Sequence, residues 1–209
     1  MSDAKLRELE RAWQATGRPQ DEAAYLVESI RVGRLTQDEL ELAAWAHHPA
    51  ALHALGGPLP GPSPDELSRW VAGLARWGRP LCVRAALEAI HQVILGRGLG
   101  IQEIHDLNVD PVRTWCEASD LRPAEHAARL EWLAGRPLRA GVSAGSQLAV
   151  AVVLAARAAL QEDFAHHAAN AVVRCEAVLG EGECKRPLVA LVVARALRRP
   201  EPPLPRASS

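Results

Sequence analysis

Seven residues in the second half of the chain, QEDFAHH at 161–167, combine two carboxylates with two neighbouring histidines. Such a group could bind a metal ion or serve as an acid and a base in catalysis. Glu162 and Asp163 precede His166 and His167 by four residues, which is the spacing at which side chains meet on a helix. A metal site would still need a third or fourth ligand from elsewhere in the chain.

The residues that follow predict where these histidines point. At 100° per residue, one face of the helix is apolar and consists of Phe164, Ala168, Ala171, Val172, Cys175, Val178 and Leu179. His166 falls opposite that face, on the polar side with Glu162, and His167 falls at its flank beside Asp163. The pattern favours charge pairing on a solvated helix surface over a metal or acid/base site.

A second histidine group, His47, His48 and His53, lies at the end of another predicted helix. Protonated histidines interact favourably with the carboxyl end of a helix dipole, so this group also has a structural explanation. The sequence leaves open whether the groups at 47–53 and 166–167 combine into one metal site. A helical metal-binding protein or hydrolase that uses these histidines is therefore kept as an alternative function.

Other chemistry is signalled less strongly. The serines and cysteines lie in no nucleophile motif, and the glycine-rich stretch at 96–100 lacks the strand and the Lys-Ser/Thr pair of a phosphate-binding loop. The cysteines never form a C-x-x-C pair, which favours buried free thiols; they are Cys82, Cys116, Cys175 and Cys184. No cofactor is predicted.

Charge and hydropathy limit the partners. The 24 basic and 25 acidic residues give a net charge of −1, so no bulk attraction to nucleic acid or acidic membranes is expected. Arginine nevertheless far outnumbers lysine, which keeps an Arg-mediated nucleic-acid binder as a second, disfavoured alternative. The charged start, MSDAKLRELERAW, has no signal-peptide core, and the longest apolar run, at 148–156, is too short to cross a bilayer. We expect a cytoplasmic protein that does not insert into membranes.

The elements that must position these residues are helices. Apolar residues recur at helical spacing between polar start signals and glycine or proline stops along the whole chain. Thr36 and Glu39 fit a capping box, and Ser143 fits an N-cap before the longest apolar helix. The sequence predicts an all-α protein of about ten helices, stacked as antiparallel hairpins into an irregular bundle that resembles helical repeats.

Composition also predicts the domain organisation. The stretch GGPLPGPSP at 56–64 is incompatible with a helix and separates an N-terminal helical module, 1–55, from a C-terminal bundle, 65–199, that we expect to pack on it. The stretch could be a surface loop or a hinge, and the loop is favoured. The proline-rich residues 200–209 are expected to be a disordered tail.

Residues 13–55 resemble an α-helical module of uncharacterised proteins from myxobacteria and planctomycetes. The resemblance lies in Trp13, Gly17, DEAAYL, Gly33, Leu35, LELAA, and His48 with AALHAL. Residues 74–90 are similar to a segment that often follows that module. The resemblance covers under half of the chain and implies no activity; by analogy alone, its alanine-rich helices are similar to HEAT or tetratricopeptide-like scaffolds.

These patterns favour a non-catalytic protein–protein interaction module, such as an adaptor, scaffold or immunity-type binding protein in the bacterial cytoplasm. Its partner would be another protein, whose identity the sequence does not give. Tryptophan is enriched at interface hot spots, and Trp77 lies at the end of its predicted helix with Arg76 and Arg79 beside it. We therefore predict a partner-binding patch at these three residues, with the surfaces around His48 or Trp132 as the next places to search.

Overall fold

The computed structural model describes residues 2–99, 107–117, 124–138, 141 and 143–198. Within these ranges every regular element is helical, and the prediction of an all-α protein is confirmed. Eleven α-helices and one 3₁₀ helix are present, close to the expected number.

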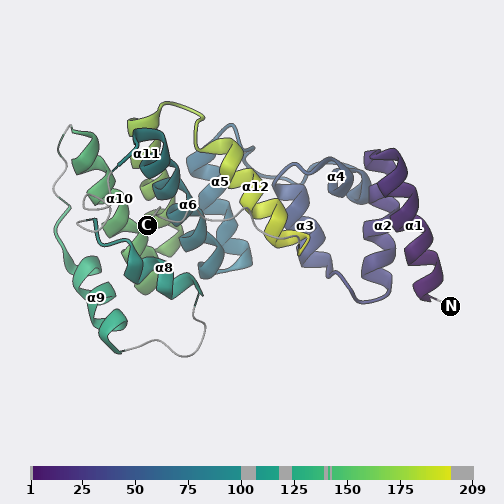
Figure 1. The fold of residues 1–209 in the computed structure, drawn as a ribbon, viewed down its shortest axis with the longest axis horizontal. Coiled ribbons are helices and arrows are strands. Elements are labelled where there is room, and N and C mark those ends of the chain that lie inside the picture. Colours follow the sequence, from purple (N-terminus) through teal and green to yellow (C-terminus); the bar gives the residue numbers. More distant parts are fainter. Residues whose placement is uncertain (1, 100–106, 118–123, 139–140, 142, 199–209) are drawn as a thin grey trace. The chain divides into compact units, whose positions relative to one another are not determined.

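The described residues form parts of two compact units (Figure 1). The described part of the first unit consists of residues 2–64 and 189–198, and that of the second unit lies within Asp65–Leu188. The boundary at Pro64 coincides with the end of the Pro/Gly stretch. The sequence analysis placed residues 189–199 in the C-terminal bundle, whereas the structure groups residues 189–198 with the first unit.

The first unit contains four consecutive helices. They are α1 (Ser2–Thr16), α2 (Pro19–Arg31), α3 (Gln37–Trp45) and α4 (Pro49–Leu55). Helix α2 packs against both α1 and α4, and α3 packs against α4. Trp13 of α1 stacks on Tyr25 of α2 with ring centroids 5.4 Å apart, so this tryptophan joins two helices.

The helix boundaries follow from local chemistry. The Thr36 hydroxyl accepts a hydrogen bond from the Glu39 backbone N–H, and the Glu39 carboxylate accepts one from the Thr36 backbone N–H, which confirms the predicted capping box. The Ser143 hydroxyl likewise accepts a hydrogen bond from the Ser146 backbone N–H and caps the long helix that follows. These caps bind backbone N–H groups that have no partner within the helix.

The Pro/Gly stretch packs on the first unit. Gly61 lies against the ring of Trp45 so closely that a Cβ atom added to Gly61 would overlap two ring carbons. Trp45 itself is buried, with 8% of its surface exposed. This contact supports a packed surface loop at this point of the stretch.

The second unit contains most of the remaining helices. They are α5 (Leu67–Gly73), the 3₁₀ helix η1 (Leu74–Trp77), α6 (Arg79–Arg97), α8 (Asp110–Glu117), α9 (Ala124–Gly135), α10 (Ala144–Leu160) and α11 (Phe164–Leu179). Helix α6 has apolar residues on both faces, packs against α5, η1, α8, α10 and α11 and is buried over most of its length, so it is the central helix of this unit.

The last helix, α12 (Lys185–Ala196), contributes residues to both units. At its start, Lys185 pairs with Asp65 of the second unit. Just beyond its end, Arg198 donates two hydrogen bonds to the Glu39 carboxylate of the first unit, at 2.7 and 3.2 Å. The predicted tail, 200–209, lies outside the described residues. None of the helices in the described part of the chain has the length and apolar character needed to cross a membrane.

Candidate protein-docking surface

The histidines at 166–167 occupy the first turn of α11, and their carboxylate neighbours do not belong to that helix. Helix α11 begins at Phe164, so Glu162 and Asp163 lie before its first turn. Among the described residues no salt bridge joins these carboxylates to His166 or His167, because Asp163 is the N-cap residue and has a non-helical backbone. Of the two expected i, i+4 pairs, Asp163 and His167 still interact electrostatically, and Asp163 opposes the lowering of the His167 pKa.

Each histidine has a different local setting. His166 is exposed, and its Nε2 lies 2.8 Å from the side-chain amide nitrogen of Asn170, on the polar side where the sequence placed it. His167 is half-buried, and burial followed by the positive charge of Arg157 lowers its pKa. Neither setting gathers further ligands or an acid/base partner.

The group at 47–53 is spread over the end of α3 and the whole of α4. His47 is exposed and adopts a left-handed backbone conformation with φ of 56°. His48 turns inward, with its Nε2 3.7 Å from a carboxylate oxygen of Glu22 on α2. His53 is exposed in the last turn of α4. His48 thus joins α4 to α2 within the first unit.

Within the part of the chain that the structure describes, no group of three or more His, Cys, Asp or Glu side chains has the geometry to hold a metal ion. Three of the cysteines, Cys82, Cys175 and Cys184, are buried. Burial raises the pKa of the Cys82 and Cys184 thiols to about 12 and that of Cys175 well above its usual value. These thiols are protonated at neutral pH and are poor nucleophiles and metal ligands.

The predicted patch at Trp77 is divided by the structure. Arg76 lies over the Trp77 ring, with the guanidinium carbon 5.2 Å from the ring centroid, and Trp77 is half-buried at the end of η1. Arg79 is turned elsewhere: it donates a hydrogen bond to the Ala159 carbonyl at 3.2 Å and lies over the Phe164 ring. The Arg79 side chain therefore links α6 to the end of α10 and the start of α11. It is not part of a patch around Trp77.

A more accessible tryptophan lies on α9. Trp132 exposes 59% of its surface, more than any other large hydrophobic side chain among the described residues. Its neighbours Leu130, Leu133 and Ala134 are buried and hold α9 in the second unit, which leaves Trp132 on the outer side of the helix. The guanidinium carbon of Arg136 lies 5.2 Å from the Trp132 ring centroid.

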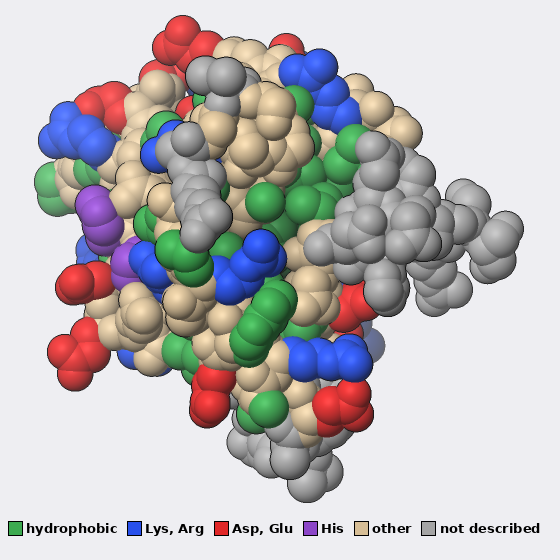
Figure 2. Space-filling model, turned by 90° about the vertical axis from the view of Figure 1, so that its left-hand side faces the viewer, with side chains coloured by type: hydrophobic (Ala, Val, Ile, Leu, Met, Phe, Trp, Pro, Cys, Tyr) green, Lys and Arg blue, Asp and Glu red, His purple; other side chains and the backbone are tan. Residues whose placement is uncertain are grey.

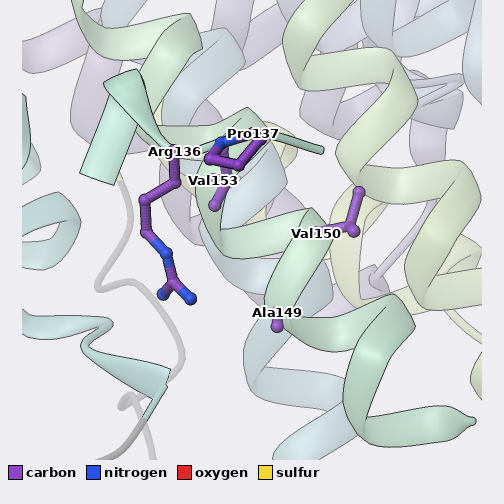
Figure 3. Close-up of a pocket in the computed structure, with 5 residues that line it drawn as sticks. All are labelled: Arg136, Pro137, Ala149, Val150 and Val153. Atoms are coloured by element: carbon purple, nitrogen blue, oxygen red, sulfur yellow. The ribbon is translucent and has the colours of Figure 1, made fainter. Parts of the chain in front are cut away.

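Arg136 also lines a pocket of about 230 Å³ next to this tryptophan. The other lining residues are Pro137, Ala149, Val150 and Val153, all of them apolar. In Figure 3, Pro137 lies beside Val153 of α10, and the guanidinium of Arg136 points away from both. We call Trp132 and the five pocket residues the α9–α10 surface.

The loop that carries Arg136 and Pro137 is fixed by hydrogen bonds from Arg157. Arg157 of α10 donates a hydrogen bond to the Ala134 carbonyl at 2.9 Å and another to the Arg136 carbonyl at 2.8 Å. Carbonyl groups at a helix carboxyl end have no partner within the helix, so a cationic donor there is favourable. The pocket is consequently built on a loop whose backbone is fixed to α10.

Hydrophobic and basic side chains lie close together on the face of the molecule at the α9–α10 end (Figure 2). Leu138 and Leu160 add to the exposed apolar area, at 43% and 38% exposed. Exposed apolar surface next to positive charge is typical of protein-binding sites and atypical of an enzyme active site that excludes water.

The sequence analysis named the surface around Trp132 as a place to search, but it could not find the pocket. Trp132 lies between Leu130 and Leu133 and therefore off the helical stripe that these residues define, which indicates exposure. The pocket is lined by residues 136–137 and by residues within 149–153. These two segments are distant in sequence and lie together because α9 packs on α10. No protein-family model matches the chain, and neither the curated proteins nor the solved structures gave a match.

Proposed function

We propose that this chain is a non-catalytic protein–protein interaction module, an adaptor, scaffold or immunity-type binding protein of the bacterial cytoplasm, and that its α9–α10 surface binds the partner. The observation that carries the proposal is Trp132, a large aromatic side chain that is 59% exposed and contacts Arg136, which lines an apolar pocket. Tryptophan and arginine are the residue types most enriched at interface hot spots.

Pocket size supports a protein partner over a small ligand. Sites for drug-sized molecules have volumes of about 300 to 1,000 Å³. The pocket beside Arg136 has about 230 Å³ and opens to solvent, so it suits one anchoring side chain of a larger partner. Because Arg157 fixes the loop, little ordering of the backbone would be needed on binding.

The proposal is tested by comparing two tryptophan–arginine surfaces in the same chain. Tagged wild-type protein, Trp132→Ala and Arg76→Glu are expressed in the native host, and co-purifying proteins are quantified by mass spectrometry. Arg79 is left unchanged because its hydrogen bond to Ala159 is structural. All three proteins should give the same circular dichroism spectrum, since both altered side chains lie at the surface.

We expect Trp132→Ala to lose the partner and Arg76→Glu to keep it. With the partner purified, isothermal titration should show about 30-fold weaker binding for Trp132→Ala, which corresponds to the roughly 2 kcal/mol typical of a hot-spot residue. The reverse pattern would move the binding site to Trp77, as the sequence alone predicted. Unchanged binding by both variants would refute both surfaces.

A further inference from the structure

We infer that the partner segment that binds the α9–α10 surface is acidic and apolar, with a hydrophobic side chain that enters the pocket and a carboxylate that pairs with Arg136. This inference rests on the proposed function and names the chemistry of the partner. Three observations support it: the charge that Arg136 gives to this surface, the lack of a carboxylate partner for Arg136 among the described residues, and the apolar side chains that line the pocket.

The α9–α10 surface, as defined, carries one charged residue, Arg136, while the exposed Glu131 is the sequence neighbour of Trp132. Between Trp132 and Gln161 the sequence contains arginines but neither Asp nor Glu, although acidic residues slightly outnumber basic ones in the whole chain. Within the described part of that segment, Arg157 is engaged by the carbonyls of Ala134 and Arg136. Within the described residues 132–138, 141 and 143–161, Arg136 is the cation whose guanidinium binds no backbone carbonyl.

Arg136 has no carboxylate partner among the described residues; the contact of its guanidinium is with the Trp132 ring. Arg129, an exposed arginine of the same helix as Trp132, is by contrast paired with Glu125 at 2.9 Å. A guanidinium that stacks on an aromatic face keeps its N–H donors at its edge for a planar carboxylate. The geometry around Arg136 therefore favours an acidic group on the partner.

The lining of the pocket beside Arg136 favours a hydrophobic side chain on the partner segment. Pro137, Ala149, Val150 and Val153 present carbon atoms, and burying a hydrophobic side chain against them is favourable in proportion to the area removed from water. The same arrangement disfavours a nucleic acid, because Arg136 already covers a face of Trp132 on which a base would stack.

The test uses random peptides displayed on phage and selected against the intact protein. Enriched peptides are synthesised with a fluorescent label, and their dissociation constants are measured by fluorescence anisotropy. We expect most of them to carry Asp or Glu within a few positions of Leu, Phe, Met or Trp. Their affinity should fall as salt concentration rises, because the charge pair lies at the surface.

Four variants separate the two contacts. Arg136→Glu should weaken binding about tenfold or more, and Arg136→Lys should weaken it less because the charge remains. Ala149→Leu should weaken binding to a similar extent by filling the pocket without changing charge. Arg186→Glu is the matched control, since Arg186 is an exposed arginine of α12 and the same charge reversal there should leave binding unchanged.

The outcomes are distinct. One outcome is that the peptides lack acidic residues, bind Arg136→Glu as tightly as wild type and bind Ala149→Leu more weakly. This result would refute an acidic partner segment but would agree with the proposed function. If the peptides bind Trp132→Ala, Arg136→Glu and Ala149→Leu as tightly as wild type, the α9–α10 surface is not their binding site. Binding of a single-stranded oligonucleotide that competes with the peptides would overturn the inference in favour of nucleic acid. Self-association that Ala149→Leu abolishes would overturn it in favour of a second copy of the chain.

Discussion

At the scale of single residues, Gly61 shows how the Pro/Gly stretch is fixed. It has a positive φ of 149°, and a Cβ atom there would overlap the Trp45 ring. We predict that Gly61→Ala lowers the free energy of unfolding by about 1 to 3 kcal/mol, as expected for overpacking against a buried ring. Urea unfolding measures this change.

The matched control for that substitution is Gly57→Ala in the same stretch. Gly57 also has a positive φ, of 150°, but a Cβ atom there meets no atom within 4 Å. The difference between the two variants isolates the contact with Trp45 from the backbone preference of glycine. Equal destabilisation by both variants would show that the ring contact contributes nothing.

His91 makes stability depend on pH. Burial, together with the positive charges of Arg113 and Arg84, lowers its pKa from 6.5 to about 4, and its Nδ1 has no hydrogen-bond partner among the described residues. Because the folded state binds this proton more weakly than the unfolded state, the stability contributed by neutral His91 is complete above pH 6.5. It is lost as the pH falls through 4.

We predict that this linkage costs about 2 kcal/mol between pH 7 and pH 5. Carboxylates also titrate at acid pH, so the measurement is the difference in unfolding free energy between wild type and His91→Leu at each pH. Leucine fills the same buried site without a proton to gain, and the difference should shift in favour of the variant as the pH falls. A difference that does not change with pH would contradict the assignment.

At the scale of elements, Arg157 connects α9 to α10 through two carbonyl groups. We predict that Arg157→Met keeps most of the apolar packing of the side chain but lowers the free energy of unfolding by about 2 kcal/mol, the range for hydrogen bonds from charged donors. Hydrogen exchange of the backbone amides near Arg136 should accelerate in this variant.

Arg129→Met is the control for that element. Its ion pair with Glu125 on α9 is exposed, and such pairs contribute about 0.5 kcal/mol. If both variants are equally stable, the hydrogen bonds of Arg157 do not hold the loop.

The elements also show what the sequence could predict. Caps at Thr36 and Ser143 and the stop at Gly78 were predictable because each depends on side chains within a few residues. The start of α11 was not, because helical spacing alone gave no reason to exclude Glu162 and Asp163. The direction of Arg79 and the pocket beside Arg136 were not predictable either, since both depend on the packing of helices distant in sequence.

At the scale of the whole molecule, the chain returns to its first unit after building the second. Residues 189–198 belong to the first unit, where Arg198 pairs with Glu39. We predict that truncation after Leu188 exposes the core of the first unit, since it also removes the buried side chains of Leu191 and Val192. Hydrogen exchange should accelerate in α3 and stay unchanged in α10. Acceleration confined to α10 would contradict the assignment of the last residues of α12 to the first unit.

The central claim is that a partner protein binds at the α9–α10 surface, and a footprint of the complex tests it most directly. Hydrogen exchange is measured by mass spectrometry on the intact chain, alone and with the co-purified partner at saturating concentration. We predict slower exchange in the peptides that cover 130–138 and 147–154, with little change in α1 to α4. Protection centred on Trp77, or on the first unit, with no change around Trp132 would contradict the account.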